Sequence, residues 1–84
     1  MGAHQPEIAY PVRWTYKVIG SDEERLRAAI GSIVGAAEHA ISYSHTSTGG
    51  RYVSLNAEVL VESEDERNRL FGQLGSHADV RVVI

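Results

Sequence analysis

Residues 49–61 restrict the fold more than any other part of the chain; a glycine pair opens this stretch, and an alternating pattern follows from Tyr52 to Val61. Apolar side chains occupy every second position, and Ser54, Asn56 and Glu58 stand between them. Alternation with a period of two is typical of a β-strand that buries one face. Such a strand needs hydrogen-bonded neighbours along its edges and a layer over its apolar face, so the rest of the chain must supply both. The apolar positions are Val53, Leu55, Ala57, Val59 and Val61.

Two further segments flank this strand in the predicted sheet. Residues 12–20 alternate in the same way and predict a strand that ends at Gly20, with Arg13, Thr15 and Lys17 on its polar face. Residues 41–47 predict another strand, which the pair Gly49-Gly50 joins to residues 53–61 as a hairpin, because glycine tolerates a positive φ. In residues 41–47 the pattern places Ile41, Tyr43 and His45 on one face and Ser42, Ser44 and Thr46 on the other.

Two helices are predicted from their starting residues. Ser21 and Ser63 are each followed by three acidic residues, a pattern typical of a capping box at the positive end of a helix dipole. The first helix carries an apolar stripe from Leu26 to Ala37 with helical spacing, and the second ends near Gly75. The second helix is expected to bury Leu70, Phe71 and Leu74.

A last strand over residues 80–84 completes the order βαββαβ, with Val80, Val82 and Ile84 on one face. Right-handed crossovers then place the first and third strands at the centre of a four-stranded antiparallel sheet and both helices on one face. The expected architecture is a two-layer α+β sandwich. Residues 1–9 are expected to form a flexible N-terminal tail, and residues 10–84 a single domain.

Composition excludes several functions. Eight Lys and Arg against eleven Asp and Glu give a net charge of −3, which disfavours nucleic acid as a partner. The absence of cysteine excludes disulfides, a thiolate nucleophile and cysteine metal sites. No apolar run approaches the roughly 20 residues that span a bilayer, and the N-terminus lacks the features of a signal peptide. A cytoplasmic location without membrane contact is therefore expected.

Several short motifs occur in order along the chain: Tyr10-Pro11, Trp14, Lys17-Val18-Ile19-Gly20, Thr46-Ser47, Gly50, Tyr52, Ser54 and Val80-Arg81-Val82-Val83-Ile84. Their order resembles the YbeD-like family of small bacterial proteins of unknown function. The resemblance covers roughly residues 10–84 and implies a ferredoxin-like fold close to ACT domains, which bind amino acids near subunit interfaces. It implies no known reaction. In ACT domains the turn after the first strand, here Gly20 and Ser21, approaches the effector; a plain strand-to-helix turn is the alternative explanation.

No catalytic or metal site is predicted. Acylphosphatases share the topology, but residues 19–22 contain no arginine that could bind phosphate. His4, His39, His45 and His77 lack the spacing of a metal site, so no metal or other cofactor is expected. The chain is not expected to be an enzyme.

The polar face of the sheet is the predicted surface for a ligand or partner, unless it is merely solvated. RNA binding by this face is a remote alternative, because Tyr52 stands alone where two or three aromatic side chains would be needed. We expect a small regulatory or protein-interaction module, or alternatively an ACT-like sensor of an amino acid or another small carboxylate. The surface residues are Arg13, Lys17, Gly20, Ser21, Tyr52, Ser54 and Asn56. A homodimer edge is predicted at Val80, Val82, Val83 and Ile84, which lack protecting proline or lysine.

Overall fold

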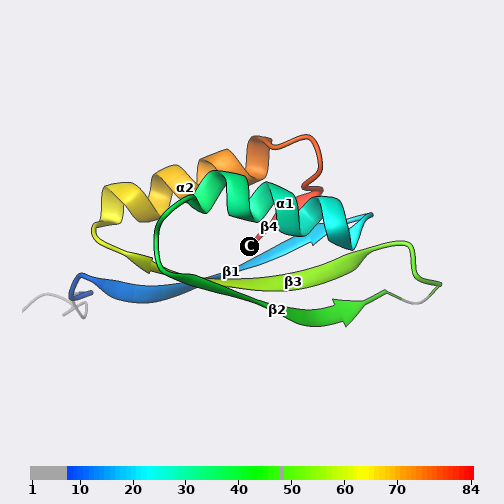
Figure 1. Cartoon of the computed structure of the whole chain (residues 1–84), viewed down its shortest axis with the longest axis horizontal. Helices are drawn as coiled ribbons and strands as arrows, with labels where there is room; N and C mark the ends of the chain where they lie inside the picture. The colour runs from blue at the N-terminus through cyan, green and yellow to red at the C-terminus, as the bar shows by residue number, and fades with distance from the viewer. Residues whose placement is uncertain (1–7, 48) are drawn as a thin grey trace, which may run out of the picture.

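The computed structural model describes residues 8–47 and 49–84, and two helices cover one face of a four-stranded antiparallel sheet (Figure 1). The sheet order is β2-β3-β1-β4, so the predicted βαββαβ sandwich of ferredoxin-like type is confirmed. Residues 1–7 of the predicted tail lie outside the described residues. Neither described helix is long and apolar enough to cross a membrane. The strands are β1 (Val12–Gly20), β2 (His39–Thr46), β3 (Val53–Val61) and β4 (Val82–Val83), and the helices are α1 (Glu23–Val34) and α2 (Glu64–Ser76).

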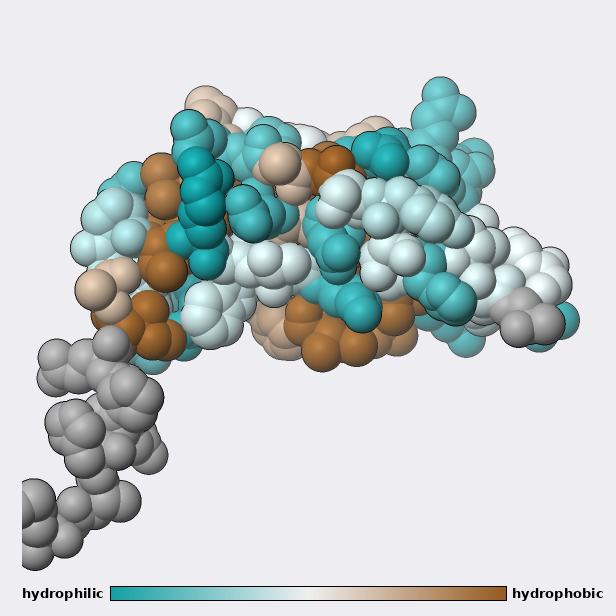
Figure 2. Space-filling view, turned by 90° about the horizontal axis from the view of Figure 1, so that it is seen from below, coloured by the Kyte–Doolittle hydropathy of each residue, from teal (hydrophilic) through white to brown (hydrophobic). Residues whose placement is uncertain are grey.

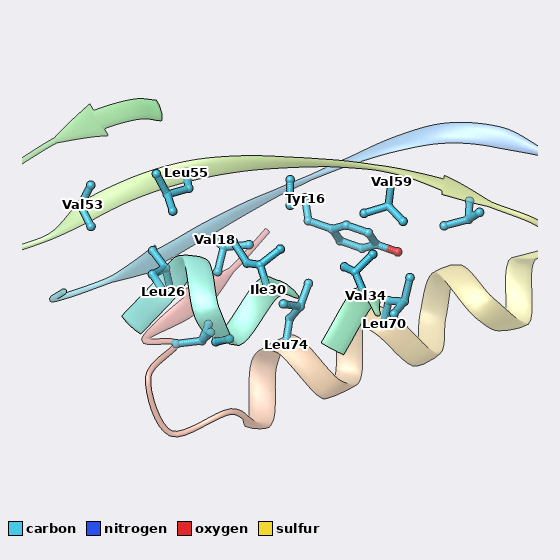
Figure 3. Close-up of a cluster of buried hydrophobic side chains, with 14 residues drawn as sticks. Tyr16, Val18, Leu26, Ile30, Val34, Val53, Leu55, Val59, Leu70 and Leu74 are labelled. Carbon is cyan, nitrogen blue, oxygen red and sulfur yellow. The ribbon is translucent and has the colours of Figure 1, made fainter. Parts of the chain in front are cut away.

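The two central strands set the register of the whole sheet. β1 and β3 pair antiparallel over their full length, from Val12 opposite Val61 to Gly20 opposite Val53. Directly paired residues share a face, so the apolar positions of both strands lie under the helices (Figure 3). A slip of one residue would turn this set outward. The largest fully buried side chains are Tyr16, Leu26, Ile30, Leu55, Leu74, Val18, Val59 and Val61.

Tyr16 is a polar member of this core, only 1 % exposed, and its hydroxyl donates a hydrogen bond of 2.7 Å to the carbonyl of Arg67 on α2. Burial raises the pKa of the Tyr16 phenol above its ordinary value of 10.0, and the nearby Arg67 guanidinium offsets part of this. The folded state therefore retains the phenolic proton more strongly than the unfolded chain does. The resulting stability is fully present below the ordinary pKa and is lost as the pH rises toward the folded pKa.

We expect the free energy of unfolding to fall as the pH rises above about 10, and the Tyr16→Phe variant to lack this part of the fall. At neutral pH the same variant should be about 1 kcal/mol less stable, because the Arg67 carbonyl loses its donor. Urea denaturation of both proteins at neutral and alkaline pH measures both effects. Tyr43→Phe, at a half-exposed edge position, is the control, and its free energy of unfolding should fall at alkaline pH as that of the parent does. An equal fall in Tyr16→Phe would contradict the assignment of this effect to the Tyr16 phenol.

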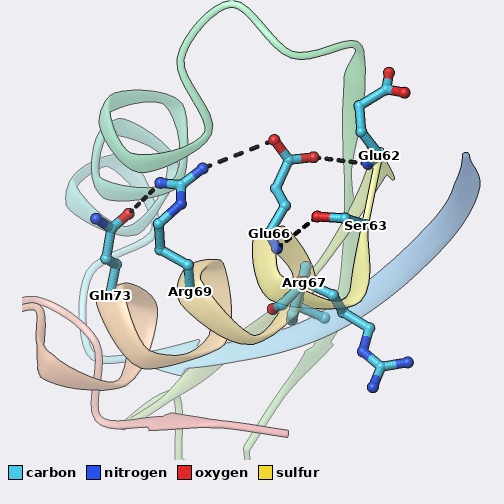
Figure 4. Close-up of polar contacts among 7 residues, drawn as sticks. Glu62, Ser63, Glu66, Arg67, Arg69 and Gln73 are labelled. Carbon is cyan, nitrogen blue, oxygen red and sulfur yellow. Dashed lines mark hydrogen bonds and ion pairs between the residues drawn. The ribbon is translucent and has the colours of Figure 1, made fainter. Parts of the chain in front are cut away.

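The helix starts differ in detail from the prediction. The N-cap of α1 is Asp22 rather than Ser21, because the Asp22 carboxylate accepts the Arg25 N–H at 2.9 Å. At α2 the predicted cap is confirmed, since the Ser63 hydroxyl accepts the Glu66 N–H at 3.1 Å. The Glu66 carboxylate reaches back to the N–H of Glu62, and Arg69 pairs with its other oxygen (Figure 4). α1 also ends at Val34, earlier than the apolar stripe suggested.

The predicted faces of the second strand are correct only in its first half. Ile41 and Tyr43 lie opposite the core residues Ala57 and Leu55, as expected. A bulge between Tyr43 and His45 then shifts the register, so His45 pairs with Ser54 and lies on the face away from the helices. The prediction for Ser44 and Thr46 is wrong for the same reason: Ser44 is the bulged residue, and Thr46 pairs with Val53 on the helix side. The glycine hairpin is confirmed, with φ of 85° at Gly49 and 69° at Gly50.

Two predictions about apolar side chains also need correction. β4 contains only Val82 and Val83, and the preceding Val80 is 7 % exposed and packs in the core instead of sharing a face with Val82. On α2, Leu70 and Leu74 are buried but Phe71 is 47 % exposed. Phe71 directly follows Leu70, and a step of one residue turns a side chain by about 100° around the helix axis, away from the sheet.

Candidate functional site

Two ladders of side chains cross the sheet face that the helices leave uncovered. The strand registers place Ser42, Asn56 and Lys17 in one row across β2, β3 and β1, and backbone hydrogen bonds of 2.9 and 3.1 Å add Ile84 to it. The neighbouring row is His45, Ser54, Ile19 and Val82. Figure 2 views the molecule from the sheet side, with polar side chains over much of the surface and apolar groups along its borders.

Lys17 and Arg13 have different surroundings on this face. The Arg13 guanidinium forms ion pairs with Glu38 at 2.5 Å and with Glu58 at 3.6 Å, so its charge is already compensated. Among the described residues, no carboxylate lies within 4.0 Å of the Lys17 ammonium group. Within residues 8–47 and 49–84, Lys17 is thus a cation without a counterion on a central strand.

Lys17 lines an open cavity of about 390 Å³ on this face, together with Ser54 and Tyr52, two other predicted surface residues. Tyr52 precedes β3 and is fixed by its loop, since its backbone N–H donates to the Ser47 hydroxyl at 2.9 Å. Ile19 supplies an apolar part of the wall. The surface of the cavity is mainly apolar, and Lys17 is the cation among its lining residues.

Ser54 has an unusual environment for a residue on the face away from the helices. Its side chain is 8 % exposed, and its Oγ has no hydrogen-bond partner among the described residues. The register places it between His45 on β2 and Ile19 on β1. A buried hydroxyl without a partner costs roughly 1–3 kcal/mol, so its satisfaction by a bound group would be favourable.

A second open cavity, of about 580 Å³, has Tyr52 in common with the first and includes Ser21. Arg51 and Arg81 also line it, and the Arg81 guanidinium lies 5.7 Å from the centre of the Tyr52 ring. Asp79 provides the one carboxylate of its lining. The two cavities therefore bring Lys17, Arg51 and Arg81 to one end of a chain whose net charge is −3.

Gly20 is explained by packing inside the protein. A Cβ atom at this position would lie 2.6 Å from the carbonyl oxygen of Asp79 and 2.9 Å from Cδ1 of Leu26. Real Cβ atoms essentially never approach backbone oxygen that closely, so the turn accepts only glycine without a local shift. The side of Gly20 on which a Cβ atom would lie faces the loop before β4. This close contact accounts for the glycine without a ligand.

The histidines that the structure describes support no metal site. His39 Nδ1 lies 2.7 Å from the Ala37 carbonyl, and His77 Nδ1 accepts the Asp79 N–H at 3.0 Å, so both rings serve local structure. In the part of the chain that the structure describes, no three His, Cys, Asp or Glu side chains converge in a way that could hold a metal ion. His4 lies outside the described residues.

The border of the sheet at β4 is short and apolar. β4 pairs with β1 only at Val18 and Ile19, and within the described ranges no strand pairs with residues 12–16 of β1 on that side. Val82 is 45 % and Ile84 68 % exposed. A cavity of about 320 Å³ beside this edge is lined by Trp14, Phe71 and Ile84, among others, and the Arg67 guanidinium lies 4.4 Å from the centre of the Trp14 ring.

The structure thus divides the predicted surface residues into groups. Lys17, Tyr52 and Ser54 meet in one cavity, and Ser21 lies in the neighbouring one. Asn56 lies beside Lys17, whereas Arg13 lies farther along β1 within its ion pairs. The sequence prediction did not include His45, Ile19 and Arg51, which also line the two cavities. The sequence held a signal only for Arg51, because the glycine turn before it could hold its side chain near Tyr52. At the predicted edge, Val82, Val83 and Ile84 lie at the border and Val80 lies in the core.

Comparison with known proteins gives a family but no activity. The model of the family "Protein of unknown function (DUF493)" matches residues 5–84. An uncharacterised protein of Campylobacter jejuni is 32 % identical over 74 residues, which cover 88 % of this chain and 85 % of the relative. A UPF0250 protein of Hahella chejuensis is 31 % identical over 85 residues, which cover 94 % of this chain and 91 % of the relative.

Solved structures confirm the fold. The solution structure of HP0495 from Helicobacter pylori superimposes with a TM-score of 0.81 at 24 % identity and covers 95 % of this chain and 88 % of that chain. YbeD is a member of the matched family, which confirms the resemblance drawn from the short motifs. The chain belongs to the DUF493 family of small bacterial proteins of unknown function.

Proposed function

We propose that the chain is a non-catalytic interaction module that associates with a second copy through the border formed by β4 and the neighbouring part of β1. The observation that carries this proposal is the concentration of exposed apolar side chains there. Five large apolar side chains are exposed in the part of the chain that the structure describes, and three of them, Phe71, Val82 and Ile84, lie at this border. An unpaired strand edge with apolar neighbours and no lysine or proline favours addition of another strand.

The opposite border of the sheet is less suited to pairing. β2 is an edge strand too, but its outer half contains the bulge between Tyr43 and His45. Bulges twist an edge and interrupt its row of backbone donors and acceptors, which is one way proteins prevent edge association. Tyr43 is the one large apolar side chain that β2 exposes in the described structure.

Sedimentation of the purified chain at micromolar concentration should show a dimer, and Val82→Lys should weaken its association about tenfold or more. The variant removes apolar contact and places like charges near one another across a two-fold axis. Because Val82 is half-exposed at an edge, the fold should survive the change. Tyr43→Lys is the matched control on the opposite border and should leave the mass unchanged. A monomer at every concentration, or dissociation by Tyr43→Lys instead, would overturn the proposal.

A further inference from the structure

The geometry points to a binding site for a small monocarboxylate with a short apolar body on the uncovered face of the sheet. The site is the cavity of about 390 Å³ between Lys17, Ser54 and Tyr52. This inference does not depend on self-association, because every side chain it uses belongs to one chain. It also differs from binding at the Gly20 turn, where internal packing explains the glycine.

The polar end of the ligand is specified by Lys17 and Ser54. Lys17 lies opposite Asn56, and Ser54 is two residues away from Asn56 on the same face, so Lys17 and Ser54 are diagonal neighbours across β1 and β3. Diagonal neighbours have Cα atoms roughly 7–8 Å apart, a separation that a carboxylate can bridge between a long ammonium side chain and a hydroxyl. The carboxylate would accept hydrogen bonds from the Lys17 ammonium and, after a rotation of the Ser54 side chain that exposes its buried Oγ, from the Ser54 hydroxyl.

Both of these groups lack partners within the described residues. The Lys17 charge has no carboxylate within 4.0 Å, and the Ser54 Oγ is buried without any hydrogen bond. Hydrogen bonds to charged groups contribute more than neutral ones, and pairing a buried orphan hydroxyl removes a cost that the free protein carries. An anion at this position therefore satisfies two groups at once.

The apolar end of the ligand is specified by the rest of the wall. Ile19 and Tyr52 line the cavity, whereas the Val53 side chain packs in the core on the other face of the sheet. A short alkyl chain fits this surface, whereas a polyanion would leave charges against it. The neighbouring cations Arg51 and Arg81 strengthen the preference for an anion over a cation at this end of the sheet.

Binding is tested with hexanoate, and hexan-1-ol and hexylamine serve as the uncharged and cationic comparisons of equal chain length. Lys17 is the chain's single lysine, so ¹³C-methylation of amines gives one side-chain signal besides the α-amino group. We expect hexanoate to shift the Lys17 methyl signal and the Ser54 and Ile19 amide signals saturably. Hexan-1-ol should bind about tenfold more weakly, because it cannot pair with the ammonium charge.

Variants then separate a specific site from general attraction of anions. Lys17→Met should weaken hexanoate binding about tenfold, and Ser54→Ala about fivefold, although Ser54→Ala should raise the melting temperature of the free protein by removing the orphan hydroxyl. Arg25→Met, which removes an exposed cation from α1, is the matched control and should bind normally.

The proposed site would be overturned if hexanoate and hexan-1-ol bound equally well, or if Arg25→Met and Lys17→Met lost the same amount of hexanoate affinity. It would also be overturned if hexanoate left the Lys17 and Ser54 signals unmoved. Sedimentation of Lys17→Met and hexanoate titration of Val82→Lys keep this test separate from the test of self-association. If Val82→Lys no longer forms a dimer but still binds hexanoate, the result supports the cavity as a site that does not need the sheet border.

Discussion

Replacing Gly20 with alanine should lower the free energy of unfolding by about 2–3 kcal/mol, a large effect for the addition of one methyl group. The new Cβ would lie 2.6 Å from the Asp79 carbonyl oxygen, which belongs to the backbone and cannot rotate away. Relief requires the loop before β4 to move, and that loop positions the buried Val80. Urea denaturation followed by circular dichroism measures the loss.

Gly72→Ala is the matched control for this experiment. Gly72 lies in the interior of α2, is exposed, and has no atom within 4 Å of the position that a Cβ would take. Alanine is favoured over glycine inside a helix, so this variant should be up to about 1 kcal/mol more stable than the parent. If Gly20→Ala behaved like Gly72→Ala, packing would no longer explain Gly20, and an approach of an effector to the turn would again need to be considered.

The fold could be predicted from the sequence because its central strands carry strong and mutually consistent patterns. β1 and β3 alternate over nine residues each, and their apolar faces pair residue by residue in the structure. Ser63 likewise marked the start of α2 correctly. In each case local preference and long-range packing favour the same conformation, which is the condition under which sequence patterns are most reliable.

The second strand could not be predicted to the same depth because one edge of it is free and its side chains are mostly polar. Ser42, Ser44 and Thr46 offer no apolar period that would indicate where a residue is inserted. The bulge reverses the faces of the last residues and brings His45 beside Ser54. Since a bulge depends on how two strands finish their pairing, the residues 41–47 alone do not determine it.

The candidate cavity was predicted only in part for a related reason. Alternation places Lys17 and Ser54 on one face, and their proximity follows from the register of β1 against β3. Tyr52 joins them only because the hairpin loop hydrogen-bonds back on itself, with the Ser47 N–H donating to the Tyr52 carbonyl at 2.9 Å. The alternation of residues along β3 also does not indicate that the Ser54 hydroxyl is buried, because it predicts that this face of the sheet contacts solvent.

Leu74→Ala should destabilise the protein by about 3 kcal/mol, whereas Phe71→Ala, which removes a larger side chain, should cost about 1 kcal/mol or less. Leu74 is fully buried between α2 and the sheet, and its truncation leaves a cavity in the core (Figure 3). Phe71 is 47 % exposed, so much of its surface is already in water. Paired urea denaturation curves measure the difference, and a loss in Phe71→Ala as large as that in Leu74→Ala would show that Phe71 belongs to the core.

The two variants also separate stability from association. Phe71 lines the cavity beside the sheet border together with Ile84, and an exposed aromatic side chain at such a position is typical of residues that contribute strongly to interfaces. Phe71→Ala should therefore retain most of its stability and still shift sedimentation toward the monomer. Asn68→Ala, which removes a polar side chain from the same cavity, is the control and should leave the mass unchanged. If Phe71→Ala sedimented like the parent protein, the interface would have to exclude α2 and depend on Val82 and Ile84 alone.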